Sequence, residues 1–241
     1  MQGRGALMTI LGDRRSFPQV GAVTTAPNQT VTIQQWNCTE STLIDWGDGN
    51  TTTHSASNAD IVSHVYVAAG SYVIRLIVNP LAVRKIYFRN SALRPNSVDF
   101  LRCTGVTYFY WINVGITTFD STHITAMPLT YLGLYNLPAG SSVTVAAADF
   151  DGWPVLLNIT FSNCLLLQAQ VDAILHGLYT GLATRTAVGG TITVGNNNAA
   201  PSGILQAQCP PITGKEYAYE LANDSCGINP TKKWATVTIT A

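Results

Sequence analysis

Residues 107–116 read TYFYWINVGI, and the pattern inside this stretch predicts the architecture of most of the chain. Phe109 and Trp111 occupy alternate positions, as expected for a β-strand with one buried face, and Asn113 follows two residues later. Apolar residues four and two positions before an asparagine recur in five segments: IYFRN (86–90), FYWIN (109–113), LGLYN (132–136), ITFSN (159–163) and ITVGN (192–196). The chain therefore contains an internal repeat built on one strand.

The repeat has a nearly regular period. Successive repeat asparagines are 23, 23, 27 and 33 residues apart: Asn90, Asn113, Asn136, Asn163 and Asn196. A strand and then an asparagine at this period resembles the leucine-rich repeat, although few leucines fill the pattern and the last apolar strand residue lies two, not three, positions before the asparagine. The resemblance implies a solenoid in which each strand adds to a parallel sheet, apolar side chains point inward, and the asparagine amide bonds backbone groups at the turn.

A second pattern covers residues 42–78, TLIDWGDGNTTTHSASNADIVSHVYVAAGSYVIRLIV. A Trp-Gly-Asp-Gly run is followed by His-x-Tyr, a glycine, a tyrosine and then alternating apolar residues: Trp46, Gly47, Asp48, Gly49, His64, Tyr66, Gly70, Tyr72, Ile74, Leu76 and Val78. The spacing resembles the PKD (polycystic-kidney-disease) repeat of extracellular and surface proteins. The resemblance implies an immunoglobulin-like β-sandwich, here shorter than the usual repeat.

The acidic residues of this motif have two interpretations. Gly47 and Gly49 permit positive φ at a tight turn, and the Asp48 carboxylate can accept backbone N–H bonds there. The alternative is a Ca²⁺ site at Asp45 and Asp48, because hard cations take clustered carboxylate oxygens. Two carboxylates without further ligands make a poor calcium cage, so we expect turn architecture and no cofactor. We also expect Trp46 in the core and His64 hydrogen-bonded within the fold.

The fold class predicted from these patterns is mainly β with some α. The expected organisation is an N-terminal arm at 1–21, a PKD-like β-sandwich at 22–80, and a leucine-rich-repeat-like α/β solenoid with an α/β C-terminal cap at 81–241. Helical spacing predicts helices over 165–182 and over 213–227, the second starting at the N-cap Thr213 with Glu216 three residues later and stopping at Gly227. The segment from QAQVDAIL (168–175) through GGTITVGNNNAAPS (189–202), followed by the second helix and the final Trp-containing strand KWATVTITA (233–241), resembles C-terminal modules of bacteriophage virion proteins.

Composition excludes several classes of partner. Hydrophobic residues make up 46% of the chain and charged residues 11%, with 13 basic and 13 acidic residues and no net charge. Nucleic-acid and anionic-membrane binding require a basic face, so neither is expected. We see neither a signal peptide nor an apolar stretch long enough to span a membrane.

The five cysteines show no zinc-ligand spacing and are interpreted as buried free thiols. Whether Cys209 and Cys226 pair with each other stays open, because spacing alone does not decide it.

Two further candidate sites remain. If alternate side chains of the 107–112 strand face the core, Tyr108 and Tyr110 face outward and could contact a glycan, because aromatic rings stack on pyranose faces. Asp149 and Asp151 are the only adjacent acidic pair suited to a polysaccharide-cleaving enzyme. No catalytic sequence motif is present, so we expect no enzymatic activity.

These observations lead to one principal hypothesis. The chain is expected to be a virion-associated structural protein of a bacteriophage, located at the particle surface as a capsid decoration, head fibre or tail component. Its expected partners are other virion proteins or copies of itself, and host-surface glycan. The alternative is an extracellular cell-surface adhesin or carbohydrate-binding module of a bacterium.

Overall fold

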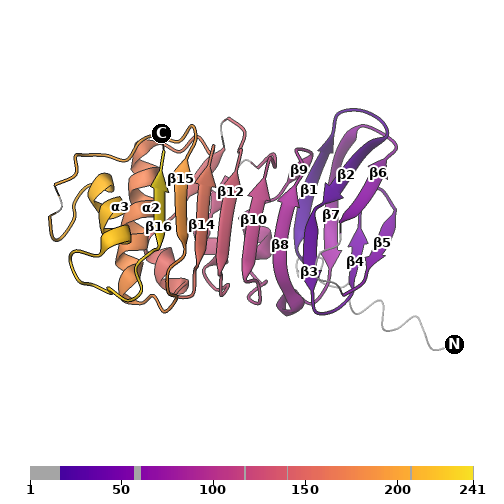
Figure 1. The fold of residues 1–241 in the computed structure, drawn as a ribbon. Helices are drawn as coiled ribbons and strands as arrows, with labels where there is room; N and C mark the ends of the chain where they lie inside the picture. Colours follow the sequence, from indigo (N-terminus) through magenta and orange to yellow (C-terminus); the bar gives the residue numbers. More distant parts are fainter. Residues whose placement is uncertain (1–16, 57–60, 117, 140, 207, 241) are drawn as a thin grey trace.

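The computed structural model describes residues 17–56, 61–116, 118–139, 141–206 and 208–240. The protein is mainly β, as predicted, and its strands lie side by side along an elongated body (Figure 1). Most of the expected N-terminal arm lies outside the described residues, but its last part, from Gln19, already belongs to a strand. No helix in the described part of the chain is both long and apolar enough to cross a membrane.

Two antiparallel sheets form the N-terminal unit. The larger has the order β5-β4-β7-β1-β9, with strands Thr51–His54, Thr42–Asp45, Gly70–Ile77, Gln19–Thr24 and Leu93–Arg94. The smaller pairs β2 (Gln29–Ile33) with β6 (Val62–Tyr66). Alternate residues of β1 and β7 are buried, so each strand turns one face to the core and one to solvent.

A seven-stranded sheet runs through the rest of the molecule. Its order is β16-β15-β14-β12-β10-β8-β3, and all neighbours are parallel except β3 and β8. The strands are β3 (Gln35–Cys38), β8 (Val83–Arg89), β10 (Tyr108–Ile112), β12 (Tyr131–Tyr135), β14 (Asn158–Ser162), β15 (Thr191–Gly195) and β16 (Thr236–Ile239). Apart from β3, strands follow one another in chain order, because each repeat adds one strand beside the last.

The boundary predicted at residue 80 is crossed by two strand pairings. β3 leaves the N-terminal unit and pairs with β8, while β9, which follows the first repeat, pairs with β1. The buried residues of both units form one continuous hydrophobic cluster. The two predicted units therefore share sheets and a core.

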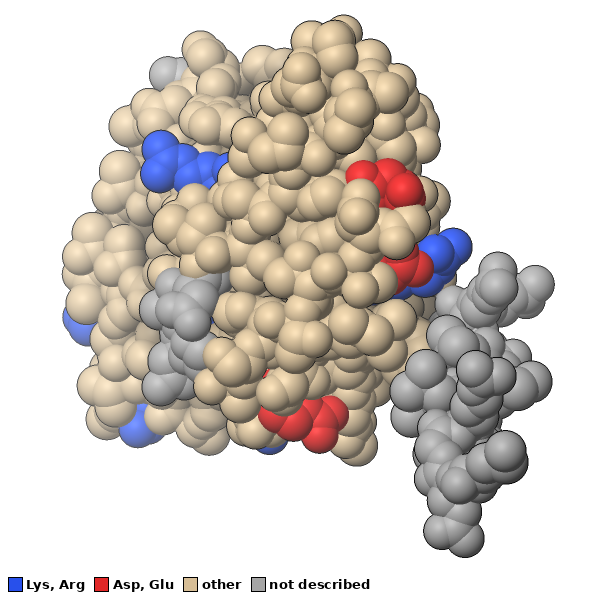
Figure 2. Space-filling view, turned by 90° about the vertical axis from the view of Figure 1, so that its right-hand side faces the viewer, with Lys and Arg blue, Asp and Glu red and all other residues tan. Residues whose placement is uncertain are grey.

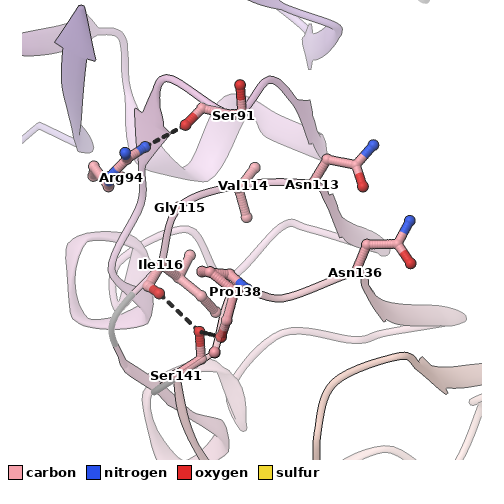
Figure 3. A pocket seen from close by; sticks show the side chains of 10 residues that line it. Ser91, Arg94, Asn113, Val114, Gly115, Ile116, Asn136, Pro138 and Ser141 are labelled. Atoms are coloured by element: carbon pink, nitrogen blue, oxygen red, sulfur yellow. Dashed lines mark hydrogen bonds between the residues drawn. The ribbon is translucent and has the colours of Figure 1, made fainter. Parts of the chain in front are cut away.

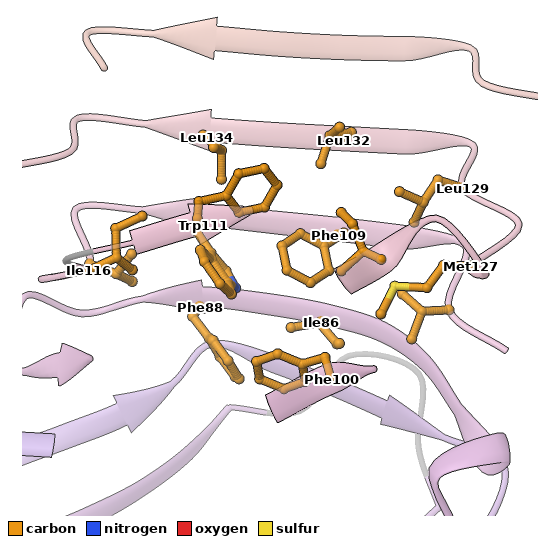
Figure 4. Packing of buried hydrophobic residues seen from close by; sticks show 14 of the residues in the cluster. Ile86, Phe88, Phe100, Phe109, Trp111, Ile116, Met127, Leu129, Leu132 and Leu134 are labelled. Atoms are coloured by element: carbon orange, nitrogen blue, oxygen red, sulfur yellow. The ribbon is translucent and has the colours of Figure 1, made fainter. Parts of the chain in front are cut away.

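The apolar positions of the repeats fill this core. All ten residues found four and two positions before the repeat asparagines are at most 1% exposed. Phe88, Phe109 and Trp111 pack around Phe100, which a short 3₁₀ helix at Ser97–Phe100 brings underneath the sheet (Figure 4). Further 3₁₀ helices lie at Pro80–Ala82, Ser121–Ile124, Ala147–Gly152 and Gly181–Ala183, and a parallel pair joins β11 (Thr118–Asp120) to β13 (Ser142–Thr144).

The repeat asparagines differ from their expected role. Asn113, Asn136, Asn163 and Asn196 have φ between 50° and 53°, a left-handed conformation that asparagine adopts more easily than most residues. The amides of three of them bond other side chains: Asn163 donates to Asn136 at 2.9 Å, and Asn196 donates to Ser162 Oγ at 2.8 Å. In these repeats asparagine is needed for its backbone conformation at the turn.

Asn198 performs the backbone-bonding role that was expected of the repeat asparagines. Its Oδ1 accepts the N–H groups of Cys164 and Leu166, and its Nδ2 donates to the carbonyls of Phe161 and Gly195, at 2.8–3.2 Å. The side chain is buried, so these four bonds satisfy backbone groups that water cannot reach. Asn90 does the same on a smaller scale by accepting the N–H of Ala92.

The predicted helices are present with changed ends. Gln168–Thr180 forms α2 and Gly214–Asn223 forms α3. Thr213 is the N-cap of α3 and Glu216 completes the capping box, as predicted. The predicted stop at Gly227 is wrong, because Asp224 already ends the helix in the left-handed conformation, where its carboxylate accepts the N–H groups of Ile228 and Asn229.

Candidate functional site

The candidate site is the solvent-facing side of the seven-stranded sheet, opposite the core in Figure 4. Strand register places the outward residues in rows across the sheet. One row joins Lys85, Tyr108 and Tyr131, and the next joins Tyr87, Tyr110 and Gly133. Tyr135 lies beside Ile112 in the third row. We call the five tyrosines of this side the tyrosine face: Tyr87, Tyr108, Tyr110, Tyr131 and Tyr135.

Tyr110 lies at the centre of the tyrosine face. Its ring centroid is 5.1 Å from Tyr87, 5.3 Å from Tyr131 and 4.9 Å from Tyr135. These neighbours leave Tyr110 only 8% exposed, so its ring is not a free stacking surface. Of the two tyrosines predicted to contact glycan, Tyr108 is half-buried and Tyr110 is covered.

A glycine makes room for this arrangement. Gly133 occupies the outward position of β12 beside Tyr110. A Cβ atom built on Gly133 would lie 2.1 Å from Cδ2 of the Tyr110 ring, far inside van der Waals contact. The absence of a side chain at this one position therefore lets Tyr110 lie over the sheet while the other tyrosines surround it.

The rings present edges and hydroxyl groups to solvent. Tyr108 and Tyr131 stack on each other at 4.5 Å with 23° between their planes, so each covers a face of the other. Burial raises the pKa of Tyr108 to about 12 and also raises the pKa of Tyr131. These phenols stay protonated at neutral pH and can donate as well as accept hydrogen bonds.

Hydroxyl groups continue the same side of the sheet beyond the tyrosines. The outward residues of β14, β15 and β16 are small and uncharged: Asn158, Thr160, Ser162, Thr191, Thr193, Gly195, Thr236 and Thr238. Thr160 and Ser162 of β14 are each only 6% exposed, so the aliphatic hydroxyls that a ligand can reach beyond the phenols are those of the threonines on β15 and β16. Such a surface offers directional hydrogen bonds without charge.

The Trp-Gly-Asp-Gly motif and the His-x-Tyr run that follows it form a closed set of contacts at the other end of the molecule. Gly47 and Gly49 have φ of 79° and 93°, as expected for the turn. The His64 ring stacks on the buried Trp46 at 5.0 Å, and the Tyr66 hydroxyl donates to the Trp46 carbonyl at 2.8 Å. The Tyr72 ring stacks on Tyr66 at 4.0 Å, and the Tyr72 hydroxyl donates to the backbone carbonyl of Ala68.

The two motif carboxylates have separate partners. Asp45 accepts the N–H of Gly47 and the guanidinium of Arg75 at 2.9 and 3.0 Å. Asp48 lies 2.7 Å from His64 Nε2 and accepts the N–H of Asn50. Burial alone would raise the pKa of Asp48, but the hydrogen bonds from His64 and Asn50 outweigh it and lower that pKa. This geometry is that of a turn whose carboxylates are already bonded.

One other group has the composition of a metal site. Cys209, Cys226 and Glu220 bring their ligand atoms within 4.8 Å of one another. The two cysteines form a disulfide, which answers the question left open by the sequence and removes their thiolates as ligands. Glu220 instead accepts the N–H of Cys226 at 2.9 Å.

The other three cysteines, Cys38, Cys103 and Cys164, are buried and free, as predicted. Burial raises the pKa of both Cys103 and Cys164 to about 12, so neither is a reactive thiolate.

A Ser–His pair is the arrangement closest to a catalytic one among the described residues. Ser97 Oγ and His123 Nδ1 lie 3.0 Å apart, and Ser97 Oγ also accepts the N–H of Asp120 at 3.0 Å. Ser97 has no exposed surface, so a substrate cannot reach its hydroxyl. Asp151 is exposed, and the side chain of Asp149 lies outside what the structure describes.

A cavity of about 440 Å³ lies beside the asparagine turns (Figure 3). Arg94, Asn113, Asn136 and Ser141 are among its lining residues. Arg94 Nη1 donates to the Leu93 carbonyl at 3.1 Å, and Ser141 Oγ donates to backbone carbonyls at 2.8 and 3.0 Å. These side chains support the turns that surround the cavity.

The surface of the N-terminal end is nearly uncharged. Figure 2 shows this end, where Asp, Glu, Lys and Arg appear only as isolated patches. No protein-family model, no curated protein and no solved structure matches this chain. The function of this protein must therefore be inferred from its own surfaces.

Proposed function

We propose that this protein is a non-enzymatic structural component of a bacteriophage particle, a capsid decoration, head fibre or tail component, that binds host-surface glycan through the tyrosine face. The observation that carries the binding function is the solvent-facing side of the seven-stranded sheet, where five tyrosines adjoin rows of threonine and serine hydroxyls. Exposed phenol edges and hydroxyl groups suit a ligand that is itself rich in hydroxyls.

The finer fold assignment is part of the same proposal. The motif contacts around Trp46, His64 and Tyr66 support a PKD-like, immunoglobulin-like sandwich in the N-terminal unit. Parallel strands in chain order, five of them followed by an asparagine, support a leucine-rich-repeat-like solenoid. Both kinds of module present large surfaces to partners, although a fold alone does not fix a function.

The particle assignment rests on different features. The resemblance of the C-terminal segment to phage virion modules suggests the location. The Cys209–Cys226 disulfide supports it, because disulfides persist at virion and cell surfaces and are rare in the cytosol. Other virion proteins or copies of this chain would then be its assembly partners.

Two measurements test the proposal. Mass spectrometry of purified phage particles should detect this chain, and its absence would remove the particle assignment. On a glycan array, Tyr108→Ala should abolish or strongly weaken binding, whereas Tyr219→Ala on α3, outside the tyrosine face, should leave it unchanged. Equal loss in both variants, or no loss in either, would contradict the role of the tyrosine face.

The second candidate function is a bacterial cell-surface adhesin or carbohydrate-binding module. The disulfide favours it as much as it favours a particle, since both locations are oxidising. Recovery of the chain from the bacterial surface rather than from particles would decide for the adhesin.

A further inference from the structure

The charges on the candidate binding surface are all positive. None of the seven strands that form the sheet contains an aspartate or a glutamate. Two basic residues project on the outward side, Lys85 and Arg89, which alternate with Tyr87 along β8. The chain has equal numbers of acidic and basic residues, but no acidic residue lies on these strands. The surface therefore has a positive local potential at the end where Lys85 and Arg89 lie.

Neither cation forms an ion pair with a carboxylate in the part of the chain that the structure describes. Among the described residues, the two ion pairs join Asp48 to His64 and Asp45 to Arg75, both in the N-terminal unit. Lys85 instead places its ammonium 4.1 Å from the ring centroid of Tyr108. A cation held against an aromatic ring and lacking a carboxylate partner can still bind an anionic group of a ligand.

We infer that the glycan bound by the tyrosine face is acidic, with a carboxylate-bearing sugar seated at Lys85 and Arg89. The inference rests on the proposed glycan-binding function and adds the charge of the ligand and its orientation. The rest of the sugar chain crosses β10, β12 and β14 over the phenol and hydroxyl groups. Neighbouring strands are about 4.8 Å apart, roughly the length of one pyranose unit, so successive sugars can meet successive strands.

A polynucleotide fits this surface less well. Single-stranded nucleic acids stack their bases on free aromatic faces, but Tyr108 and Tyr131 cover one another and Tyr110 is buried by its neighbours. Two cations also neutralise too few phosphates for useful affinity at physiological salt. A hydroxyl-rich chain with occasional carboxylates matches both the number of cations and the exposed ring edges.

The experiment compares an oligogalacturonate with its carboxyl-reduced, uncharged counterpart, using the full chain and isothermal titration calorimetry. The acidic oligosaccharide should bind more tightly, and its affinity should fall as salt concentration rises. The double variant Lys85→Met and Arg89→Met should weaken acidic binding about tenfold at low ionic strength and remove most of its salt dependence. Lys215→Met, which removes a charge from α3, should have no effect.

The outcomes separate the two proposals. Equal affinity for the acidic and reduced oligosaccharides, unaffected by the double variant, would overturn the inference while leaving glycan binding intact. Binding of neither oligosaccharide, together with no signal on the glycan array, would overturn the proposed function as well. Preferential binding of single-stranded RNA over both sugars would contradict both.

Discussion

Replacing Gly133 with alanine should destabilise the protein although alanine is normally preferred to glycine in a strand. The added Cβ would lie 2.1 and 2.2 Å from two atoms of the Tyr110 ring, so the ring must move by more than 1 Å to restore contact distance. Overpacking of this kind costs about 1–3 kcal/mol. Movement of Tyr110 also disturbs its ring contacts with Tyr87, Tyr131 and Tyr135. We expect the free energy of unfolding to fall by about 2 kcal/mol and Tm by about 4–8 °C.

Urea unfolding followed by circular dichroism measures this change, and a double-mutant cycle isolates its cause. In the background Tyr110→Ala the clash is absent, so Gly133→Ala should be neutral or stabilise by up to about 1 kcal/mol through the reduced entropy of the unfolded chain. An equal loss of stability in both backgrounds would refute the reasoning. It would mean that the glycine is required by the backbone and not by the ring above it.

Three further predictions concern stability. Asn198→Ala should lower the free energy of unfolding by at least about 3 kcal/mol in urea titrations, because four buried backbone groups lose their partner; a loss below about 1 kcal/mol would mean that water replaces the amide. Cys209→Ala with Cys226→Ala should lower it by about 3 kcal/mol, given a sequence separation of 17 residues, and dithiothreitol should then have no further effect. The lowered pKa of Asp48 contributes stability that is full above its ordinary value of 3.8 and is lost as pH falls through the folded-state pKa. Asp48→Asn should therefore flatten the acid limb of a stability–pH profile below about pH 4, and an unchanged acid limb would show that Asp48 does not contribute.

The sequence predicts the repeat strands because burial imposes a period of two that is visible in each segment. Asn113 marks the end of one such strand, and its alignment with Asn136 also gives the register of β10 and β12. That alignment places Tyr110 beside Gly133, so the pairing in the tyrosine face was encoded in the sequence. The pattern within a single strand does not reveal this pairing, because the pairing depends on rows that run across neighbouring strands.

Other features depend on contacts that no local pattern encodes. The exchange of β3 and β9 between the two units requires long-range pairing, which is set by the whole core. Asn198 stands in a run of three asparagines, and only the fold determines which of them is buried. The Cys209–Cys226 bond likewise depends on how the loop before α3 returns to the end of that helix.

The direction of the strands has a mechanical consequence. In Figure 1 the strands of the seven-stranded sheet stand across the long axis, so the hydrogen bonds between them run along it, from β3 to β16. A pull on the two ends would peel the sheet apart one strand at a time, whereas a force across the molecule would have to shear whole rows of bonds together. The sheet should therefore unfold at a lower force when it is pulled along the long axis than when it is pulled across it.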